Sequence, residues 1–172
     1  MTLDLKSFVL EVPDFPKAGI QFKDITPLWA DPEAFRQAIQ AMVEPVLALK
    51  ATHVLGLESR GFIFGAAMAK KLGLGFVPAR KPGKLPRPTL REKYGLEYGT
   101  DALEIHRDAF RSGDRVLIVD DVLATGGTGA AARRLVEGTG AQAMALTIFI
   151  ELTALSGREQ LSGLPVFSVL RY

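Results

Sequence analysis

Short apolar runs separated by tight turns recur along the chain. Residues 53–58 (HVLGLE) and 75–79 (GFVPA) have the length and composition of buried strands. Between them, FIFGAAMAKKLG (62–73) has the apolar content of a helix that Gly73 can end. Strand, helix and strand with such short connections predict a βαβ unit, whose crossover makes the two strands parallel.

The second half of the chain repeats this order. RVLIV (115–119) is the most strand-like run, the glycine-rich segment 120–129 opens a helix over residues 130–140, and AMALTIFI (143–150) is a further strand that ends at Glu151. The pattern predicts an α/β fold with an open, mainly parallel sheet flanked by helices. In such sheets ligands bind at the carboxyl ends of the strands.

A further helix is expected before this sheet. Asp31 can cap it, Pro32 suits its first turn, and apolar residues recur at helical spacing from Phe35 to Val46. Pro45 is expected to shorten or kink this helix.

Residues 80–100 differ in kind from the segments on either side. Pro82, Pro86 and Pro88 predict irregular backbone, and six Lys and Arg side chains concentrate positive charge there. Loops of this length inside compact domains are usually lids or binding segments. We therefore interpret residues 80–100 as a long, flexible and basic lid loop.

The composition narrows the class of protein. With 172 residues, of which 48% are hydrophobic, the chain is long enough for one domain with a buried core and too short for two, so residues 1–172 are assigned to a single domain. The 21 Lys and Arg residues against 19 Asp and Glu residues give a net charge of +2. This excess is too small for a general nucleic-acid-binding surface, so any basic site must be local.

Two scarce residue types exclude further classes. The chain has no Cys, which excludes disulfide frameworks, thiolate nucleophiles and cysteine-based zinc sites, and its two His residues are too few for a histidine-rich metal centre. Asp4, Glu11 and Asp14 interrupt the N-terminal segment where a secretory signal needs an apolar run, and no stretch reaches the roughly 20 apolar residues of a membrane helix. We expect a cytoplasmic protein with no membrane partner.

The segment 115–129 (RVLIVDDVLATGGTG) combines two carboxylates with a glycine-rich turn. A buried strand delivers Asp120 and Asp121, and the turn leads into a helix whose free N–H groups and positive dipole end favour a phosphate. Two acids beside a phosphate would repel it unless sugar hydroxyls or a divalent cation intervene. The residue types therefore predict a phosphorylated sugar as the ligand.

Other interpretations of this segment are possible. It lacks Gly-Lys-Ser/Thr, so it is not the phosphate loop of nucleoside triphosphatases. Gly127, Gly129 and Ala132 satisfy a dinucleotide fingerprint, and Glu151 stands where a ribose-binding acid would be expected. That fingerprint places its first glycine almost directly after the strand, whereas seven residues separate Val119 from Gly127. A helix cap with two solvated acids is the remaining alternative.

Several blocks of the chain resemble the type I phosphoribosyltransferases. VLIVDDVLATGGT is similar to their phosphoribosyl pyrophosphate signature, and further blocks resemble the branch of the family that acts on adenine: PDFPKAGIQFKDITP, GLESRGFIFG, RKPGKLP, LEYGTDALEIH and ELTALSGREQL. The resemblance implies the type I fold and transfer of the 5-phosphoribosyl group from phosphoribosyl pyrophosphate to adenine, which gives AMP and pyrophosphate. It also implies Mg²⁺, held mainly through the substrate, and a homodimer.

The resemblance assigns roles to the residues at matching positions. Asp120 and Asp121 would hold the ribose 2- and 3-hydroxyls, the turn would cradle the 5-phosphate, and basic residues would neutralise the pyrophosphate leaving group. The cradle residues are Ala124, Thr125, Gly126, Gly127 and Thr128, and the basic residues are Arg60, Arg80, Lys81 and Lys84.

The resemblance also places the base. Glu97 would act at the base nitrogen as adenine loses a ring proton, and Tyr98 would cover the reacting centre as the lid closes. Residues 1–30 would form a hood over the base, with Ile20 and Phe22 as apolar contacts and the segment up to Lys23 at the ring edge. Gln21 and Lys23 stand where an apolar residue and an arginine are commoner in the family, which bears on base specificity.

Two other functions stay open at this point. A related enzyme for a 6-oxopurine would need a donor aimed at the carbonyl oxygen, typically a lysine, and the chain has no lysine after Lys93. A regulatory protein that only senses phosphoribosyl pyrophosphate need not keep the lid acid or the leaving-group cations, which this chain keeps.

Overall fold

The computed structural model describes residues 2–95 and 100–172, which fall into two compact units, Met1–Ala41 and Met42–Tyr172. In the first unit a short 3₁₀ helix (Leu5–Phe8) precedes the antiparallel strands β1 (Leu10–Pro13) and β2 (Gln21–Asp24), and α1 (Thr26–Ala30) follows them. The assignment of residues 1–172 to a single domain stays a prediction.

The expected helix after Asp31 is present as α2 (Pro32–Val43). The Asp31 carboxylate accepts hydrogen bonds from the backbone N–H groups of Glu33 (3.0 Å) and Ala34 (2.8 Å), which are the contacts of an N-cap. The helix ends before Pro45, and a 3₁₀ segment (Glu44–Leu49) continues the chain, so the shortening expected from that proline is confirmed.

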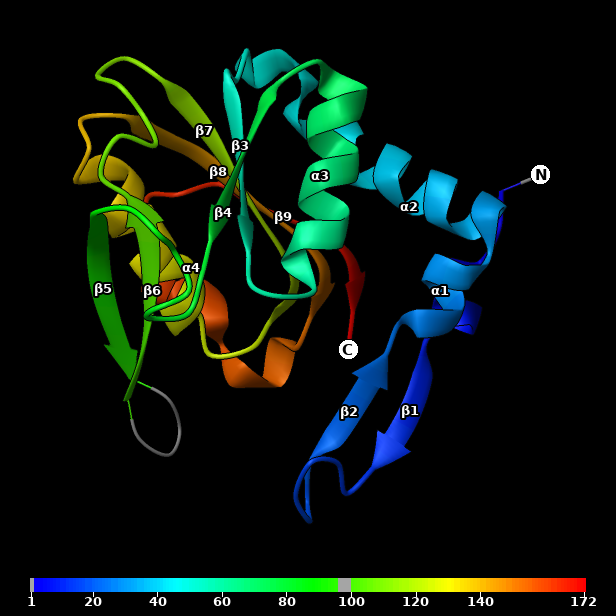
Figure 1. The fold of residues 1–172 in the computed structure, drawn as a ribbon. Coiled ribbons are helices and arrows are strands. Elements are labelled where there is room, and N and C mark those ends of the chain that lie inside the picture. The colour runs from blue at the N-terminus through cyan, green and yellow to red at the C-terminus, as the bar shows by residue number, and fades with distance from the viewer. Residues whose placement is uncertain (1, 96–99) are drawn as a thin grey trace. The chain divides into compact units, whose positions relative to one another are not determined.

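A five-stranded parallel sheet forms the centre of the second unit (Figure 1). Its strands are β3 (His53–Leu57), β4 (Gly75–Ala79), β7 (Arg115–Leu123), β8 (Gln142–Glu151) and β9 (Val166–Arg171), and the order across the sheet is β4-β3-β7-β8-β9. The predicted α/β class with a parallel sheet is confirmed. Strand β9 was not predicted, although PVFSVL has the β-branched and aromatic residues of a strand.

Two helices cover the two faces of this sheet. On one face Phe64 of α3 (Gly61–Leu72) stacks on Phe149 of β8, with ring centroids 5.2 Å apart. On the other face Leu135 of α4 (Gly127–Glu137) belongs to a buried cluster with Leu55 and Ile118. Successive strand residues point to opposite faces, so the continuous apolar runs of β3, β7 and β8 bury both sides.

The connections around the sheet set the position of the ligand site. The β3–α3–β4 crossover leads toward one edge, whereas β7–α4–β8 and then β9 lead toward the other. The direction therefore reverses between the neighbouring strands β3 and β7. In open α/β sheets the crevice for a ligand forms at the carboxyl ends of strands at such a reversal.

The prediction of irregular backbone throughout residues 80–100 is wrong for the part after Pro88. Strand β5 (Thr89–Gly95) pairs antiparallel with β6 (Thr100–His106), which makes a separate two-stranded hairpin. The three prolines all precede Thr89, and from Thr89 onward nothing in the sequence prevents a ladder; the charged side chains of β5 mostly face outward while Tyr94 is buried. The role of the segment as a lid stays a prediction.

The strand before the glycine-rich turn is also longer than predicted. It continues through Asp120 and Asp121 to Leu123, because Val122 and Leu123 still pair with Ile150 and Glu151 of β8. The turn is therefore only Ala124–Gly126, and the spacing argument used against a dinucleotide site does not hold.

In the described part of the chain, no helix has the length and apolar character needed to span a bilayer.

Candidate active site

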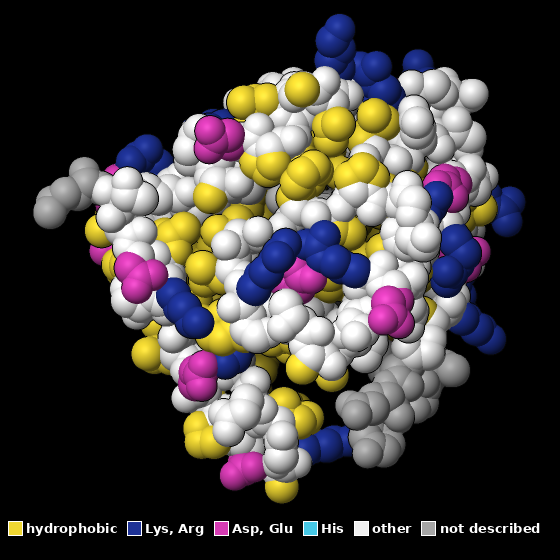
Figure 2. All heavy atoms as spheres, turned by 180° about the vertical axis from the view of Figure 1, so that it is seen from behind, with side chains coloured by type: hydrophobic (Ala, Val, Ile, Leu, Met, Phe, Trp, Pro, Cys, Tyr) yellow, Lys and Arg dark blue, Asp and Glu magenta, His cyan; other side chains and the backbone are white. Residues whose placement is uncertain are grey.

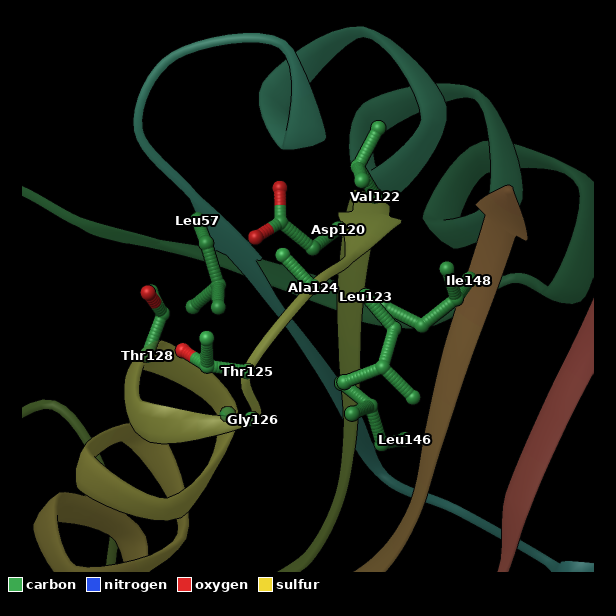
Figure 3. Close-up of a pocket in the computed structure, with 11 residues that line it drawn as sticks. Leu57, Asp120, Val122, Leu123, Ala124, Thr125, Gly126, Thr128, Leu146 and Ile148 are labelled. Carbon is green, nitrogen blue, oxygen red and sulfur yellow. The ribbon is translucent and has the colours of Figure 1, made fainter. Parts of the chain in front are cut away.

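A pocket of about 130 Å³ opens at the carboxyl end of β7, beside the start of α4 (Figure 3). The Asp120 side chain lies at its wall, and Thr125 and Thr128 line it from the turn and from the start of α4. The lining residues are Leu57, Asp120, Val122, Leu123, Ala124, Thr125, Gly126, Thr128, Gly129, Leu146 and Ile148. Polar groups thus converge at one end of a pocket whose floor is apolar, as in sites for small molecules.

The two predicted aspartates do not share one environment. Asp120 lines the pocket, whereas Asp121, on the next position of the strand, is buried and forms an ion pair with Arg60 (Nε to Oδ2, 2.7 Å). The Asp120 carboxylate also accepts a hydrogen bond from the Asp121 backbone N–H at 2.9 Å. Asp120 is thus the acid that a ligand in this pocket can reach directly.

Burial and the neighbouring Asp121 carboxylate raise the pKa of Asp120 well above its usual value. The side chain still has access to the pocket, since part of its surface is open to solvent. A hydroxyl donor or a cation that enters the pocket would favour the charged form of this carboxylate and would bind to it.

The turn that follows β7 depends on glycines in two separate segments. Gly126 has φ +89°, and a Cβ on this residue would lie 2.2 Å from the carbonyl oxygen of Gly157. A Cβ on Gly157 would lie 2.2 Å from the carbonyl oxygen of Ala124. The turn therefore rests directly on the backbone of the segment near Gly157, and its shape requires that neither residue carries a side chain.

A buried acid holds that supporting segment in place. The Glu151 carboxylate at the end of β8 accepts two hydrogen bonds from the Arg158 guanidinium (2.6 and 2.8 Å) and one from the Ser168 hydroxyl (2.6 Å). The hydrogen bonds from Arg158, together with the one from Ser168, lower the pKa of Glu151 to about 2 despite burial. Arg158 directly follows Gly157, so this pair fixes the backbone on which the turn rests.

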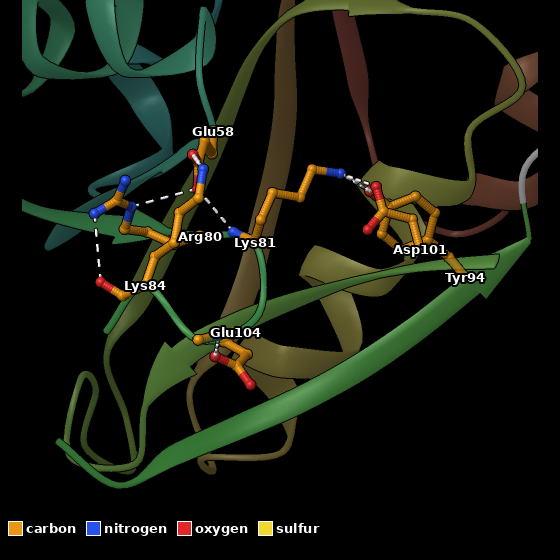
Figure 4. A network of polar contacts seen from close by, with 8 residues as sticks. Glu58, Arg80, Lys81, Lys84, Tyr94, Asp101 and Glu104 are labelled. Carbon is orange, nitrogen blue, oxygen red and sulfur yellow. Dashed lines mark hydrogen bonds and ion pairs between the residues drawn. The ribbon is translucent and has the colours of Figure 1, made fainter. Parts of the chain in front are cut away.

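Two of the four predicted leaving-group cations, Arg80 and Lys84, pair with a second acid, Glu58, which directly follows β3 (Figure 4). Its carboxylate accepts hydrogen bonds from Arg80 Nε (3.3 Å), the Lys81 backbone N–H (2.8 Å) and the Lys84 ammonium. Burial opposes the charged form, but hydrogen bonds from Lys84, the Lys81 backbone and Arg80 outweigh it and lower the pKa of Glu58 to about 2.

The Lys81 side chain points away from Glu58 (Figure 4). Its ammonium forms an ion pair with Asp101 of β6 and donates a hydrogen bond to the Tyr94 hydroxyl of β5 at 2.7 Å. The backbone of residues 80–84 is attached to β6 as well, because Arg80 and Glu104 exchange backbone hydrogen bonds and the Gly83 N–H donates to the Glu104 carboxylate.

The structure brings some of the predicted residues together and leaves others apart. Asp120, Ala124, Thr125, Gly126 and Thr128 line one pocket, and Arg80 and Lys84 meet at Glu58. The predicted base contacts Ile20, Phe22 and Lys23 lie in the first unit, where the Phe22 ring packs edge-on against Phe15 and Lys23 pairs with Glu11. Glu97 and Tyr98 lie outside the described residues.

Three acids of the site region were missed from the sequence: Glu58, Asp101 and Glu104. Glu58 ends a predicted strand two positions before Arg60, and its position at a carboxyl strand end near a basic residue was the available signal. Asp101 and Glu104 gave no such signal, because the hairpin that carries them was not recognised.

Basic side chains do not form one continuous patch on the face shown in Figure 2. Lys and Arg side chains lie there among Asp and Glu side chains and hydrophobic groups. This mixture agrees with the small net charge of the chain.

Comparison with known proteins identifies the family. The profile of the phosphoribosyl transferase domain matches residues 31–168, and the chain belongs to this family. It is 55% identical to the adenine phosphoribosyltransferase of Carboxydothermus hydrogenoformans, over 99% of this chain and all of the relative. It is also 55% identical to that of Francisella tularensis subsp. tularensis, over the full length of both. Within the family, the chain therefore groups with the adenine phosphoribosyltransferases.

Solved structures agree with this grouping. The chain matches the adenine phosphoribosyltransferase of Rhodothermus marinus with a TM-score of 0.94 and 54% identity, over 98% of this chain and 96% of that one. It matches the enzyme of Saccharomyces cerevisiae, solved with adenine and an imino-altritol bisphosphate, with a TM-score of 0.92 and 43% identity, over 97% of both chains. The predicted type I fold is confirmed.

Replacing Gly157 by alanine should weaken ribose 5-phosphate binding by about tenfold or more, because the added methyl group displaces the Ala124 carbonyl and the turn with it, and overpacking of this kind costs about 1–3 kcal/mol. Calorimetric titration measures the effect. The matched control is Ser156→Ala, which alters an exposed neighbour and should bind like the wild type. Unchanged affinity in Gly157→Ala would show that the turn does not depend on this contact.

The free energy of unfolding should include a contribution from ionised Glu151 at neutral pH that is absent in strong acid. Because folding lowers its pKa from 4.5 to about 2, its contribution is complete above pH 4.5 and is lost as the pH falls toward 2. Glu151→Gln should therefore lower the free energy of unfolding at pH 7 by up to about 3 kcal/mol, with a smaller difference at pH 3. Urea unfolding at both pH values tests this. Glu159→Gln, an exposed acid in the same segment, should have little effect at either pH.

Proposed function

We propose that the chain transfers the 5-phosphoribosyl group from phosphoribosyl pyrophosphate to adenine, giving AMP and pyrophosphate. The observation that carries the proposal is the pocket at the reversal between β3 and β7. There, an accessible carboxylate, two threonine hydroxyls and a turn without bulky side chains meet the first turn of a helix. This combination suits a sugar that carries a terminal phosphate.

In this proposal the turn and the start of α4 bind the 5-phosphate. The residues Ala124, Thr125, Gly126, Gly127 and Thr128 offer backbone N–H groups and hydroxyls, and the positive end of the helix dipole favours the anion. Asp120 accepts hydrogen bonds from ribose hydroxyls. Asp121 is held by Arg60 and reaches the sugar only with some rearrangement of this ion pair.

The leaving group is pyrophosphate, whose negative charge is bound by Arg60, Arg80, Lys81 and Lys84. Bond breaking at the anomeric carbon leaves a centre of oxocarbenium character, as in glycoside cleavage, and needs no protonation of this leaving group. The contribution of the protein is therefore positioning and charge stabilisation.

Mg²⁺ is proposed as the cofactor. It prefers one or two carboxylates together with phosphate oxygens and water, and Asp120 beside the sugar-phosphate pocket fits that need. Among the described residues no group of three or more acids or histidines could hold a metal alone, so the substrate would supply most of the oxygen ligands. When bound, the ion would neutralise charge on the departing pyrophosphate.

Glu97 is proposed to accept the proton that adenine loses, and Tyr98 to shield the reacting centre from water. Both lie between Gly95 and Thr100, the paired ends of the β5–β6 hairpin, and the Gly95 carbonyl lies beside the first residue of α4. The described end of β5 at Gly95 therefore lies beside the phosphate cradle. Ile20, Phe22 and Lys23 are proposed to contact the base.

A homodimer in the cytoplasm completes the proposal. Strand β4 is an edge strand of the sheet, and next to it Ile63 of α3 and Phe76 of β4 are large apolar side chains that stay exposed. The Phe76 ring also contacts Phe62 edge-on. An exposed apolar surface along an edge strand is the kind of surface that a second copy of the chain would cover.

Replacing Asp120 by alanine should reduce phosphoribosyl pyrophosphate affinity, and replacing both aspartates should reduce it by several kcal/mol, since each hydrogen bond to a charged group contributes about 1.5–3 kcal/mol. The single Asp120 variant should account for most of the loss, because Asp120 lines the pocket. Calorimetry with circular dichroism as a folding control measures both variants. Wild-type affinity in the double variant would refute the assigned role.

Glu97→Gln should lower kcat by about a hundredfold or more while adenine affinity changes little, because a general base acts on the chemical step. Steady-state kinetics of pyrophosphate release with adenine, guanine, hypoxanthine and orotate tests both this role and base specificity. Glu92→Gln on the same hairpin is the control and should leave both parameters near their wild-type values. A loss confined to adenine affinity would contradict the assignment.

A further inference from the structure

Each cation proposed to bind the leaving group is already paired with a carboxylate of the protein. Arg60 pairs with Asp121, Arg80 and Lys84 pair with Glu58, and Lys81 pairs with Asp101. An arriving pyrophosphate must therefore exchange places with these carboxylates, at least in part, and cannot simply enter a group of free positive charges.

We propose that Asp101 competes with pyrophosphate for Lys81 and thereby sets the affinity for the leaving group. This inference rests on the proposed function, because it takes residues 80–84 to be the leaving-group site. It assigns a role to an acid that does not itself touch the substrate: Asp101 acts through Lys81 and is a positioning residue.

The geometry around Lys81 supports this competition. Its ammonium is shared between the Asp101 carboxylate and the Tyr94 hydroxyl, and Tyr94 also donates a hydrogen bond to Asp101 at 3.2 Å. The other Asp101 oxygen accepts the Ala102 backbone N–H at 2.7 Å. Lys81 is therefore held on the hairpin side, although its backbone N–H donates to Glu58 beside Arg80 and Lys84.

Lys81 can change partner at low cost. Its side chain is about one-third exposed, as is that of Asp101, so neither charge would be left in a fully dry environment after separation. Lysine carries a compact charge on a flexible four-carbon stem and can swing between acceptors. Pyrophosphate carries more negative charge than one carboxylate and can draw the ammonium across.

Glu58 is a less suitable competitor. It is buried with its side chain 9% exposed, it accepts from a backbone N–H as well as from Arg80 and Lys84, and its removal would leave those groups without their shared acceptor. A change at Glu58 would thus disturb the loop itself. Asp101 pairs with only one of the four proposed leaving-group cations, Lys81, so a substitution at Asp101 leaves the contacts of the other three in place.

The movement of Lys81 from Asp101 to pyrophosphate would also affect the phosphate cradle. Tyr94 and Gly95 end β5 against the first residue of α4: a Cβ on Gly127 would lie 3.0 Å from the Gly95 carbonyl oxygen and 3.6 Å from the Tyr94 ring. Withdrawal of Lys81 removes one of the hydrogen bonds that hold Tyr94. The hairpin thus links the leaving-group cations to the pocket for the sugar phosphate.

A double-mutant cycle tests the proposal. Calorimetry with inorganic pyrophosphate and magnesium, at fixed pH and ionic strength, would compare the wild-type protein with Asp101→Asn, Lys81→Met and the double variant. Asp101→Asn should bind pyrophosphate about twofold to fivefold more tightly, which is the range expected when a partly exposed ion pair no longer competes. In the Lys81→Met background the same substitution should leave affinity unchanged.

Two controls keep the test decisive. Asp108→Asn removes an exposed carboxylate that pairs with Arg87 outside this cluster, and it should not change pyrophosphate affinity. Tyr94→Phe removes a hydroxyl that accepts a hydrogen bond from Lys81 and donates one to Asp101. Because Lys81 then loses one of its two acceptors on the hairpin, binding should tighten in the same direction, and this variant tests the proposal if Asp101→Asn does not fold.

The possible failures are distinguishable. Unchanged or weaker binding by Asp101→Asn would overturn the inference while leaving the proposed transferase function intact. An equal gain in pyrophosphate affinity from Asp101→Asn in the Lys81→Met background would also overturn it. The Asp101 carboxylate would then weaken binding by direct charge repulsion of pyrophosphate and not by holding Lys81. Absence of pyrophosphate binding by the wild type would overturn the assignment of residues 80–84 to the leaving group, and the inference with it.

Discussion

Backbone packing between the turn Ala124–Gly126 and Gly157 is the contact on which the pocket at the carboxyl end of β7 depends. Two glycines that are distant in sequence allow two stretches of main chain to approach more closely than any side chain would permit. The ion pair between Glu151 and Arg158 then keeps the second stretch in place. The segment around Gly157 and Arg158 therefore determines the shape of the pocket although it contributes no lining side chain to it.

The order of the strands explains why two acids with different tasks end up near one another along the sheet. Strands β3 and β7 are neighbours and parallel, so Glu58, directly after β3, and Asp120, in the last part of β7, lie toward the same edge of the sheet. Glu58 gathers cations, whereas Asp120 stays accessible to a ligand. The same sheet edge thus separates a region suited to anionic phosphate groups from one suited to sugar hydroxyls.

Local features of the fold could be read from the sequence because short-range physics determines them. Gly73 ends α3 with a positive φ of 68°, Asp31 caps α2, and the apolar runs of β3, β7 and β8 are largely buried strands of a parallel sheet. The pocket residues around Thr125 were found for the same reason: strand, small-residue turn and helix follow each other directly in the chain.

The features that could not be predicted from the sequence depend on contacts between residues that are far apart in the chain. Strand β5 is rich in charge and is stabilised by pairing with β6, and β7 extends through two aspartates because β8 continues beside it. The pairing of Lys81 with Asp101 links residues 20 positions apart, and that of Glu58 with Lys84 links residues 26 apart. No periodicity indicates such contacts, since they exist only once the hairpin and the sheet are assembled.

The pairing of acids and bases around Glu58 also bears on how a polyanion reaches this protein. Three cations, Arg80, Lys81 and Lys84, lie within a few ångströms of two carboxylates, Glu58 and Asp101, so the cluster projects less potential into solvent than three unpaired cations would. The association rate of a polyanion with this protein should then depend mainly on diffusion and on short-range contacts. Added salt should lower this rate far less than it does for a protein with an open basic cleft.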